Sequence, residues 1–246
     1  MRETLEAIAL RAGQEIMRFY PISEEQIQGK ADGSPVTSAD LAAHQIIIEQ
    51  LTKISDFPIV SEESFDPGLY PPQASRFWLV DPLDGTKDFI RGTDHFTVNI
   101  ALIEEGVATV GVVYAPVSDD VYSAYQGGAF KNGAKIHTSP VNPEMIGAIS
   151  HFHKGDEVDA FFIRNQIEVK EAIGSSLKFC LLAEGVIDIY PRLSPTSEWD
   201  TAAGQAVAEA AGCQVIDLET GKPLRYGTLP ILNSNFIAAK PGITWV

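Results

Sequence analysis

The most informative stretch of the sequence is the hexapeptide Asp81-Pro82-Leu83-Asp84-Gly85-Thr86, which follows the apolar run Phe77 to Val80. Pro82 prevents an ordinary continuation of a strand, and Gly85 allows backbone angles that other residues avoid. Two carboxylates three residues apart on such a turn can converge on one point and bind a metal ion. If Gly85 and Thr86 open a helix, its unpaired backbone N–H groups would also favour a phosphate. The alternative is an ordinary turn, in which both aspartates bond to local backbone groups.

Other carboxylates stand where they can join this turn. Glu62 and Glu63 directly follow the short apolar run Pro58 to Val60, although glutamate pairs at such places are also common on protein surfaces. Asp200 follows Trp199 at the start of an alanine-rich segment, where an aspartate can bind a metal or cap a helix. Carboxylates at the ends of elements in separate segments are typical of sites that bind divalent cations.

Asp40 has two candidate roles. Thr37 and Asp40 have the spacing of a capping box, which would start a helix at this point. Asp40 can instead reach the hydroxyl group of Thr86 and polarise a water molecule through it. Both interpretations stay open at the level of the sequence.

The elements expected to carry these residues begin with two helices. Apolar residues recur at spacings of three and four from Leu5 to Phe19, which predicts an amphipathic helix that ends before Pro21. Residues 21–36 are polar and predict a loop, and a second helix follows Ser38. Short apolar runs then predict strands at residues 58–60, 77–80, 97–103, 107–114, 121–125 and 129–136.

The rest of the chain alternates strands and helices. Strands are predicted at residues 145–150, 167–173, 186–190, 215–218 and 235–239, and helices at residues 175–184 and 201–211. We place a boundary near residue 140. Residues 1–140 would then form an α+β half with a mixed or antiparallel sheet, which we expect to bind metal and phosphate. Residues 141–246 would form an α/β half, which we expect to complete the metal site and bind substrate.

The charge of the chain excludes several classes of function. The 246 residues include 18 basic and 33 acidic side chains, for a net charge of −15. Such a chain is a poor ligand for nucleic acid or for an anionic membrane, because both require many lysines and arginines. An excess of carboxylates suits divalent cations instead.

The cysteines and the apolar runs point to a cellular compartment. Cys180 and Cys213 cannot form a disulfide framework, charges interrupt the first apolar segment, and no stretch approaches ~18 uncharged apolar residues. We therefore expect a cytoplasmic protein without a transmembrane segment. A homodimer and a peripheral association with the inner membrane are both compatible with the sequence.

The motifs together resemble the lithium-sensitive, magnesium-dependent phosphatase superfamily of inositol monophosphatase and fructose-1,6-bisphosphatase. The matching pieces are Glu62-Glu63, the hexapeptide 81–86 and Trp199-Asp200-Thr201-Ala202-Ala203-Gly204, in the family's order, and the resemblance extends from Gly33 to Asn235. Within the superfamily the chain is most similar to the 3'(2'),5'-bisphosphate nucleotidases of the CysQ type. That similarity rests on Gly85-Thr86-Lys87-Asp88-Phe89, on Ser175-Ser176-Leu177-Lys178-Phe179-Cys180 and on Tyr190-Pro191-Arg192.

The resemblance implies a fold and an activity. The fold would be a layered αβαβα sandwich of the inositol monophosphatase type. The activity would be Mg²⁺-dependent hydrolysis of the 3'-phosphate of adenosine 3',5'-bisphosphate, or of its sulfated form, in sulfur metabolism and with sensitivity to lithium. The alternative substrate is inositol-1-phosphate or another small sugar phosphate. A non-catalytic regulator that kept the fold is a further alternative, against which the complete set of carboxylates counts.

The resemblance also implies roles for individual residues. Glu62, Asp81 and the backbone carbonyl of Leu83 would hold one Mg²⁺, and Asp81, Asp84 and Asp200 a second, with two or three ions in all. The amides of Gly85 and Thr86 would bind phosphate oxygens, while Asp40 and Thr86 orient the attacking water. Ser175, Lys178 and Arg192 would bind the second phosphate of a bisphosphate nucleotide, although a lone lysine is more often a solvated surface charge. His151 or His153 would supply the histidine that the CysQ type carries in this region.

Overall fold

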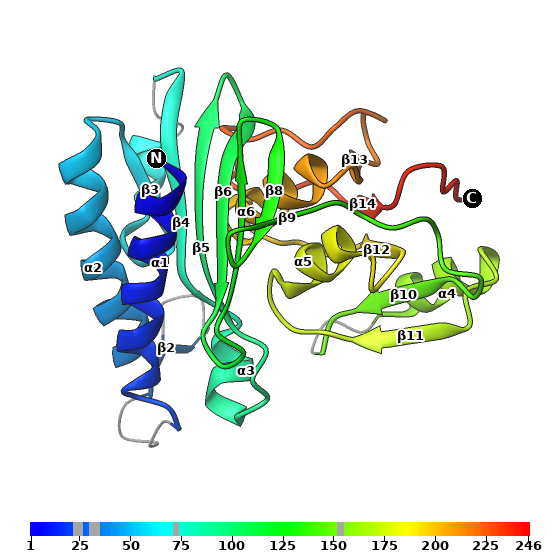
Figure 1. Ribbon diagram of the computed structural model, residues 1–246, viewed down its shortest axis with the longest axis horizontal. Helices are drawn as coiled ribbons and strands as arrows, with labels where there is room; N and C mark the ends of the chain where they lie inside the picture. The colour runs from blue at the N-terminus through cyan, green and yellow to red at the C-terminus, as the bar shows by residue number, and fades with distance from the viewer. Residues whose placement is uncertain (22–26, 30–34, 71–73, 152–154) are drawn as a thin grey trace.

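Helices and sheets alternate in five layers in the computed structural model, which describes residues 1–21, 27–29, 35–70, 74–151 and 155–246 (Figure 1). Helices α1 (Arg2–Met17) and α2 (Ser38–Ile54) cover one face of a seven-stranded sheet. Helices α5 (Leu177–Glu184) and α6 (Glu198–Ala210) cover its other face. A five-stranded sheet packs on the far side of α5 and α6, and α4 (Asp156–Arg164) covers its outer face. The predicted αβαβα layering is confirmed.

The seven-stranded sheet follows the order of the chain from β3 to β9. Strands β3 and β4 are parallel, and every later pair is antiparallel. Because helices cover both faces, the central strands are continuous apolar runs, as the sequence indicated. On β5, Ile100 faces α1 and α2, whereas Ala101 and Ile103 face α5 and α6. The strands are β3 (Ile59–Ser61), β4 (Arg76–Asp84), β5 (Thr97–Glu104), β6 (Val107–Ala115), β7 (Asp120–Tyr125), β8 (Gly128–Lys131) and β9 (Ala134–Ile136).

The five-stranded sheet is mixed. Its order is β11-β10-β12-β14-β13, in which β10 pairs in parallel with β11 and β12, and β14 pairs antiparallel with β12 and β13. The strands are β10 (Ile146–Ile149), β11 (Val169–Ala172), β12 (Ile189–Arg192), β13 (Gln214–Asp217) and β14 (Phe236–Ala239). Within the described ranges, no helix combines the length and the apolar character that crossing a membrane requires.

Several element boundaries differ from the expectation. Helix α4 was not predicted, α5 begins two residues later than expected, and α6 begins at Glu198 instead of Thr201. The segment 21–36, expected as a loop, contributes two paired strands, β1 (Ile27–Gly29) and β2 (Pro35–Thr37), and the residues between them lie outside the described part. The division of the chain near residue 140 stays a prediction. Helix α6, which lies in the second half, contacts strands of both sheets and so packs across the proposed boundary.

Helix α6 lies close against the seven-stranded sheet because small residues meet there. A Cβ atom at Gly111 of β6 would lie 2.5 Å from the backbone oxygen of Ala203 and 2.9 Å from the Cβ atom of Ala206. Glycine is therefore required at this position of the strand. Since α6 carries Asp200 and the sheet carries Asp81 and Asp84, this contact helps to set the spacing of the site.

Candidate active site

An irregularity in β4 brings Asp81 and Asp84 to the end of the strand with their side chains in one region. Asp81 pairs with Asn99 and Asp84 pairs with Thr97, and the register shifts between the two pairs. Pro82 falls inside this bulge, where the ladder is already interrupted and a missing N–H costs little.

Gly85 then turns the chain from β4 into α3 (Thr86–Arg91), with a φ of +91°. A Cβ atom at this glycine would lie 3.0 Å from the backbone oxygen of His95, in a conformation that other residues rarely adopt. The predicted sequence of strand, tight turn and helix is confirmed.

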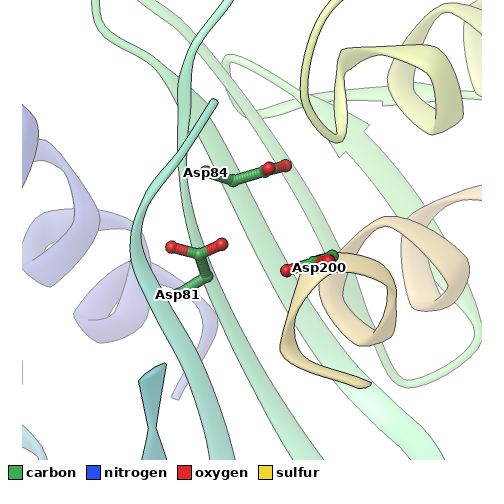
Figure 2. Close-up of side chains that lie close together, drawn as sticks. All are labelled: Asp81, Asp84 and Asp200. Atoms are coloured by element: carbon green, nitrogen blue, oxygen red, sulfur yellow. The ribbon is translucent and has the colours of Figure 1, made fainter. Parts of the chain in front are cut away.

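Asp200 completes a cluster of three carboxylates. Oxygen atoms of Asp81, Asp84 and Asp200 all lie within 4.8 Å of one another. Figure 2 shows the three side chains converging, two from β4 and one from the first turn of α6. The fold thus brings together two segments that are far apart in the sequence, as the positions of these carboxylates predict.

The cluster is electrostatically unfavourable without a counter-charge. Burial raises the pKa of Asp81 well above its usual range, and neighbouring carboxylates, above all Glu62, raise it further. Burial also raises the pKa of Asp84, although Lys178 and a hydrogen bond from Ser176 act in the opposite direction. Burial and the charge of Asp84 raise the pKa of Asp200 to about 7. Buried oxygen donors that repel one another fit a hard divalent cation, which would supply the missing positive charge.

Two residues that were not predicted hold Asp84. Asn99 of β5 donates from Nδ2 to Asp84 Oδ2 over 3.2 Å, and Ser176 donates from Oγ to the same oxygen over 3.0 Å. Asn99 also donates to Ser176 Oγ over 2.8 Å, so the three side chains form one network. The available signal was a polar Asn99 inside an otherwise apolar strand, where a buried amide needs partners.

Asp200 is the third residue of α6 and not its N-cap. Ser197 is the N-cap, and Asp200 Oδ2 accepts the backbone N–H of Ser197 over 2.9 Å and the hydroxyl of Thr196. The simple N-cap interpretation of Asp200 is therefore wrong, and a capping box takes its place.

Asp40 makes the contacts that both of its candidate roles require. It closes a capping box with Thr37, whose backbone N–H lies 2.8 Å from Asp40 Oδ2. Its other oxygen, Oδ1, lies 3.3 Å from the hydroxyl of Thr86. The same hydroxyl lies 3.3 Å from the carbonyl oxygen of Leu83. Asp40 is 1% exposed, so Thr86 stands between it and the site.

A cavity beside the cluster of Asp81, Asp84 and Asp200 is lined by most of the predicted site residues. Asp40, Asp81 and Leu83 are buried and meet the lining through Thr86 and Asp84. The predicted residues in the lining are Glu62, Asp84, Gly85, Thr86, Ser175, Lys178, Arg192 and Asp200. Residues that were not predicted there are Lys87, Asp88, Ser150, Phe179, Tyr190, Thr196 and Thr201.

Lys178 and Arg192 are buried and engaged, so their interpretation as solvated surface charges is wrong. Lys178 is 4% exposed, and its Nζ donates to the backbone oxygens of Ile173 over 3.0 Å and Ser175 over 2.7 Å. Arg192 donates to the backbone oxygens of Ser194 over 3.1 Å and Pro195 over 2.8 Å. Burial lowers the pKa of Lys178 to about 8.

Ser175 lies before α5 instead of inside it, with a φ of +47°. Its hydroxyl oxygen lies 3.4 Å from the backbone nitrogen of Leu177 and accepts that N–H. The expected helical spacing between Ser175 and Lys178 is therefore absent, and a tight turn brings both residues to the cavity.

The histidine near the cavity is His151. Its ring lies 2.6 Å from Asp88 Oδ1 and 3.0 Å from the backbone oxygen of Ala172, and it stacks on His95 at 4.8 Å. His153 lies outside the described residues. His95 carried no signal in the sequence, since only the fold brings it beside His151.

Comparison with known proteins places the chain in a family. The family model described as "Inositol monophosphatase family" matches residues 1–244. A 3'(2'),5'-bisphosphate nucleotidase CysQ of Escherichia coli K12 is 46% identical over 226 residues, which cover 89% of this chain and 91% of the relative. The protein of the same name from Buchnera aphidicola is 39% identical over 94% of this chain and 91% of its own length.

Solved structures show the same fold. The CysQ of Bacteroides thetaiotaomicron, described as a bacterial member of the inositol monophosphatase family, matches with a TM-score of 0.84 and 35% identity over 97% of both chains. An IMPase of Thermotoga maritima matches with a TM-score of 0.81 and 26% identity over 96% of this chain and 91% of its own. The family model matches nearly the whole chain, and the carboxylates of β4 and α6 converge in the structure. The chain therefore belongs to the inositol monophosphatase family.

Proposed function

We propose that this chain is a metal-dependent 3'(2'),5'-bisphosphate nucleotidase, which hydrolyses the 3'-phosphate of adenosine 3',5'-bisphosphate to leave AMP and phosphate. The observation that carries the proposal is a cavity whose lining combines side chains of opposite charge. The carboxylates Glu62, Asp84 and Asp200 and the cations Lys178 and Arg192 all face it. The nucleotidases that are 46% identical over nine tenths of the chain support the same substrate class.

The carboxylates of the site would hold the metal ions. Glu62, Asp81 and the carbonyl of Leu83 would bind one ion, and Asp81, Asp84 and Asp200 a second. Mg²⁺ is the cation that suits such oxygen donors, and we infer two or three ions per chain. When bound, these cations neutralise the charge on the phosphate and make a water molecule a better nucleophile.

The residues of the chain then position the reactants. The Thr86 hydroxyl donates to Asp40 Oδ1 and would accept a hydrogen bond from the attacking water. Along these hydrogen bonds a proton of the water would move toward the buried carboxylate of Asp40. The backbone amides of Gly85 and Thr86 would donate to phosphate oxygens. Phosphoryl transfer depends mainly on such positioning and on charge neutralisation, and requires no covalent intermediate on the protein.

Lys178 and Arg192 would bind the second phosphate. Lys178 Nζ has three hydrogens and two carbonyl partners, and Arg192 has five N–H groups and two carbonyl partners among the described residues. Both side chains are therefore fixed by the backbone and still have donors for an anion in the cavity. The hydroxyl of Ser175, which lines the same cavity, would add a further contact.

Hydrolysis of inositol-1-phosphate is the second candidate, because the same carboxylates would serve it and an IMPase shares the fold. Hydrolysis of this monophosphate does not require Lys178 and Arg192 in the lining. We further infer that the protein acts in the cytoplasm on small molecules and not on nucleic acid.

A panel assay tests the proposal. Phosphate release would be measured with Mg²⁺ on adenosine 3',5'-bisphosphate, inositol-1-phosphate, fructose-1,6-bisphosphate and AMP. We expect the highest kcat/KM on the adenosine bisphosphate and little release from AMP. A preference for inositol-1-phosphate would replace the nucleotidase assignment by the second candidate.

A further inference from the structure

The four acidic residues proposed to bind metal come from three separate segments. Asp81 and Asp84 are fixed by the pairing of β4 with β5, but Glu62 and Asp200 lie outside the paired strands. Glu62 begins a 3-10 turn (Glu62–Ser64) after β3, and Asp200 lies in the first turn of α6. The pairing of β3 with β4 ends at Ser61, and α6 packs on the sheet at Gly111. Direct contacts between the two segments would fix the freedom that remains between Glu62 and Asp200.

The two residues that precede Asp200 contact the segment that follows Glu62. The ring of Trp199 meets the ring of Phe65 edge to face, with centroids 5.2 Å apart. The carboxylate of Glu198 accepts the hydroxyl of Tyr70 over 2.5 Å. Residues 62–70 are therefore fastened to the start of α6 at two points.

Glu198 is fully buried, and four donors converge on its two oxygens. Oε2 accepts from Tyr70 and from the backbone N–H of Gly227 over 2.7 Å. Oε1 accepts from the backbone N–H of Thr228 over 3.0 Å and from its hydroxyl over 2.8 Å. A buried carboxylate is costly, and these four hydrogen bonds compensate for its burial. Three of them come from residues 227 and 228, and only the bond from Tyr70 reaches the segment that follows Glu62.

We infer that Glu198 is a positioning residue for the metal site, which acts with Tyr70 to hold Glu62 at a fixed distance from Asp200. The inference rests on the proposed function, since it presumes that Glu62 and Asp200 bind metal. Residues that orient metal ligands from outside commonly change metal affinity by about ten- to hundredfold when they are replaced. Glu198 and Tyr70 do not line the cavity, so their replacement removes no contact of the lining itself.

Tyr70→Phe is the most selective test. Tyr70 also packs against Phe65 and Phe77, with centroids 5.7 Å and 6.3 Å away, so phenylalanine keeps the ring contacts and removes only the hydroxyl. Tyr122→Phe is the matched control. Tyr122 is likewise buried and its hydroxyl bonds to a carboxylate, that of Glu184, but these residues lie in β7 and α5 and not in the segments that carry Glu62 and Asp200.

The readout is the Mg²⁺ concentration at which half of the metal-binding signal is reached in a calorimetric titration at constant temperature, measured without substrate. For Tyr70→Phe we expect this concentration to increase by about tenfold, while kcat at saturating Mg²⁺ returns close to the wild-type value. For Tyr122→Phe we expect a lower Tm in the absence of metal and an unchanged Mg²⁺ midpoint. Glu198→Gln, which keeps the shape of the side chain, is expected to shift the midpoint in the same direction as Tyr70→Phe.

An unchanged midpoint in Tyr70→Phe would overturn the inference, because the bond would then serve stability alone. A loss of kcat that saturating Mg²⁺ does not restore would overturn it as well. Because no substrate is present, an error in the substrate assignment leaves the midpoint interpretable. A wild-type protein that shows no Mg²⁺ binding in this titration would overturn the metal site together with this inference.

Discussion

Two aspartates of the site use their two oxygens for different purposes. In Asp40 and in Asp200, Oδ2 accepts hydrogen bonds from the residue that caps the helix. The remaining oxygen of Asp40 holds Thr86, and Asp200 joins the carboxylate cluster. Capping fixes the side-chain conformation, so the second oxygen is already oriented before any ligand arrives. Cap and site residue are therefore compatible roles at these positions.

The charge of Asp84 tests the metal site. Asp84→Asn keeps the shape of the side chain but removes a negative charge from the cluster, so we expect turnover to be abolished. The Tm without metal should stay the same or rise, because repulsion among Asp81, Asp84 and Asp200 is relieved. Activity and Tm are measured with Mg²⁺ and with a chelator. Near wild-type turnover at saturating Mg²⁺ would contradict the assignment of Asp84 as a ligand.

The pair Asp40 and Thr86 tests the activation of water. Thr86→Val should lower kcat sharply and change KM little, because it removes the hydroxyl that stands between Asp40 and the cavity. Asp40→Asn should lower both kcat and stability, with a loss of ~1–2 kcal/mol from the weakened capping box. Steady-state kinetics and thermal unfolding of both variants separate the roles. If Asp40→Asn lowers only the Tm, Asp40 is a cap and takes no part in the reaction.

Lys178 and Arg192 test substrate choice. Each replacement by alanine should lower kcat/KM for adenosine 3',5'-bisphosphate about ten- to hundredfold, since a hydrogen bond to a charged group contributes ~1.5–3 kcal/mol. Hydrolysis of a small monophosphate should hardly change. The pKa of Lys178 is lowered by burial to about 8, so KM for the bisphosphate should rise above that pH as the ammonium loses its proton. Equal losses on both substrates would assign these residues to the fold.

At the scale of elements, the strands were predictable because helices cover both faces of the sheets and leave long apolar runs. Helix α4 escaped prediction because only Phe161 and Phe162 of its nine residues are buried, among several charges. The predicted start of α6 at Thr201 is wrong because Ser197 and Asp200 form a capping box that begins the helix at Glu198. Thr37 and Asp40 have the same spacing at the start of α2.

The carboxylates of the site were predictable from their places at the ends of strands and helices. The residues that hold them were not. Asn99 and Ser176 contact Asp84 only because β5 pairs with β4 in one register and α5 packs beside them. Such contacts depend on the three-dimensional arrangement. In the sequence they are visible at most as a polar residue within an apolar run.

Gly111 tests the contact between α6 and the sheet. In Gly111→Ala the new Cβ atom would overlap the backbone of Ala203, so α6 must move away from β6. We expect a loss of ~1–3 kcal/mol in the free energy of unfolding, as for other overpacked cores. The Mg²⁺ midpoint should also rise, because α6 carries Asp200. Urea unfolding and metal titration measure the two effects.

Gly155→Ala is the control for this variant. Gly155 has an extended backbone with a φ of −141°, and none of the described residues lies within 4 Å of an added Cβ atom. It should leave both quantities nearly unchanged. If Gly111→Ala destabilises the protein without a change in the Mg²⁺ midpoint, the position of α6 does not limit metal binding.

At the scale of the whole molecule, the acidic cluster couples stability to pH. A carboxyl group with a higher pKa in the folded protein stabilises the fold below its unfolded value of 3.8, and this stability is lost as the pH rises through the folded value, about 7 for Asp200. The metal-free protein should therefore lose stability across this window. Bound cations offset the loss, because they favour the ionised carboxylates.

We thus expect Mg²⁺ to raise the Tm more at about pH 8 than at about pH 5. Thermal unfolding with Mg²⁺ and with a chelator, at both pH values, measures the difference, and Asp84→Asn should reduce it. A rise in Tm that is equal at both pH values would show that the cation binds elsewhere.

The placement of Asp200 on α6 also has a consequence for biosynthesis. During translation the ribosome completes strands β3 to β9, with Asp81 and Asp84 on β4, well before α6 is made. A chain released before that point contains the sheet with Glu62, Asp81 and Asp84 but lacks Asp200, together with Lys178 and Arg192 when it ends before α5. We therefore expect the complete metal site, and with it the cleavage of phosphate esters, to form only after α6 has been synthesised.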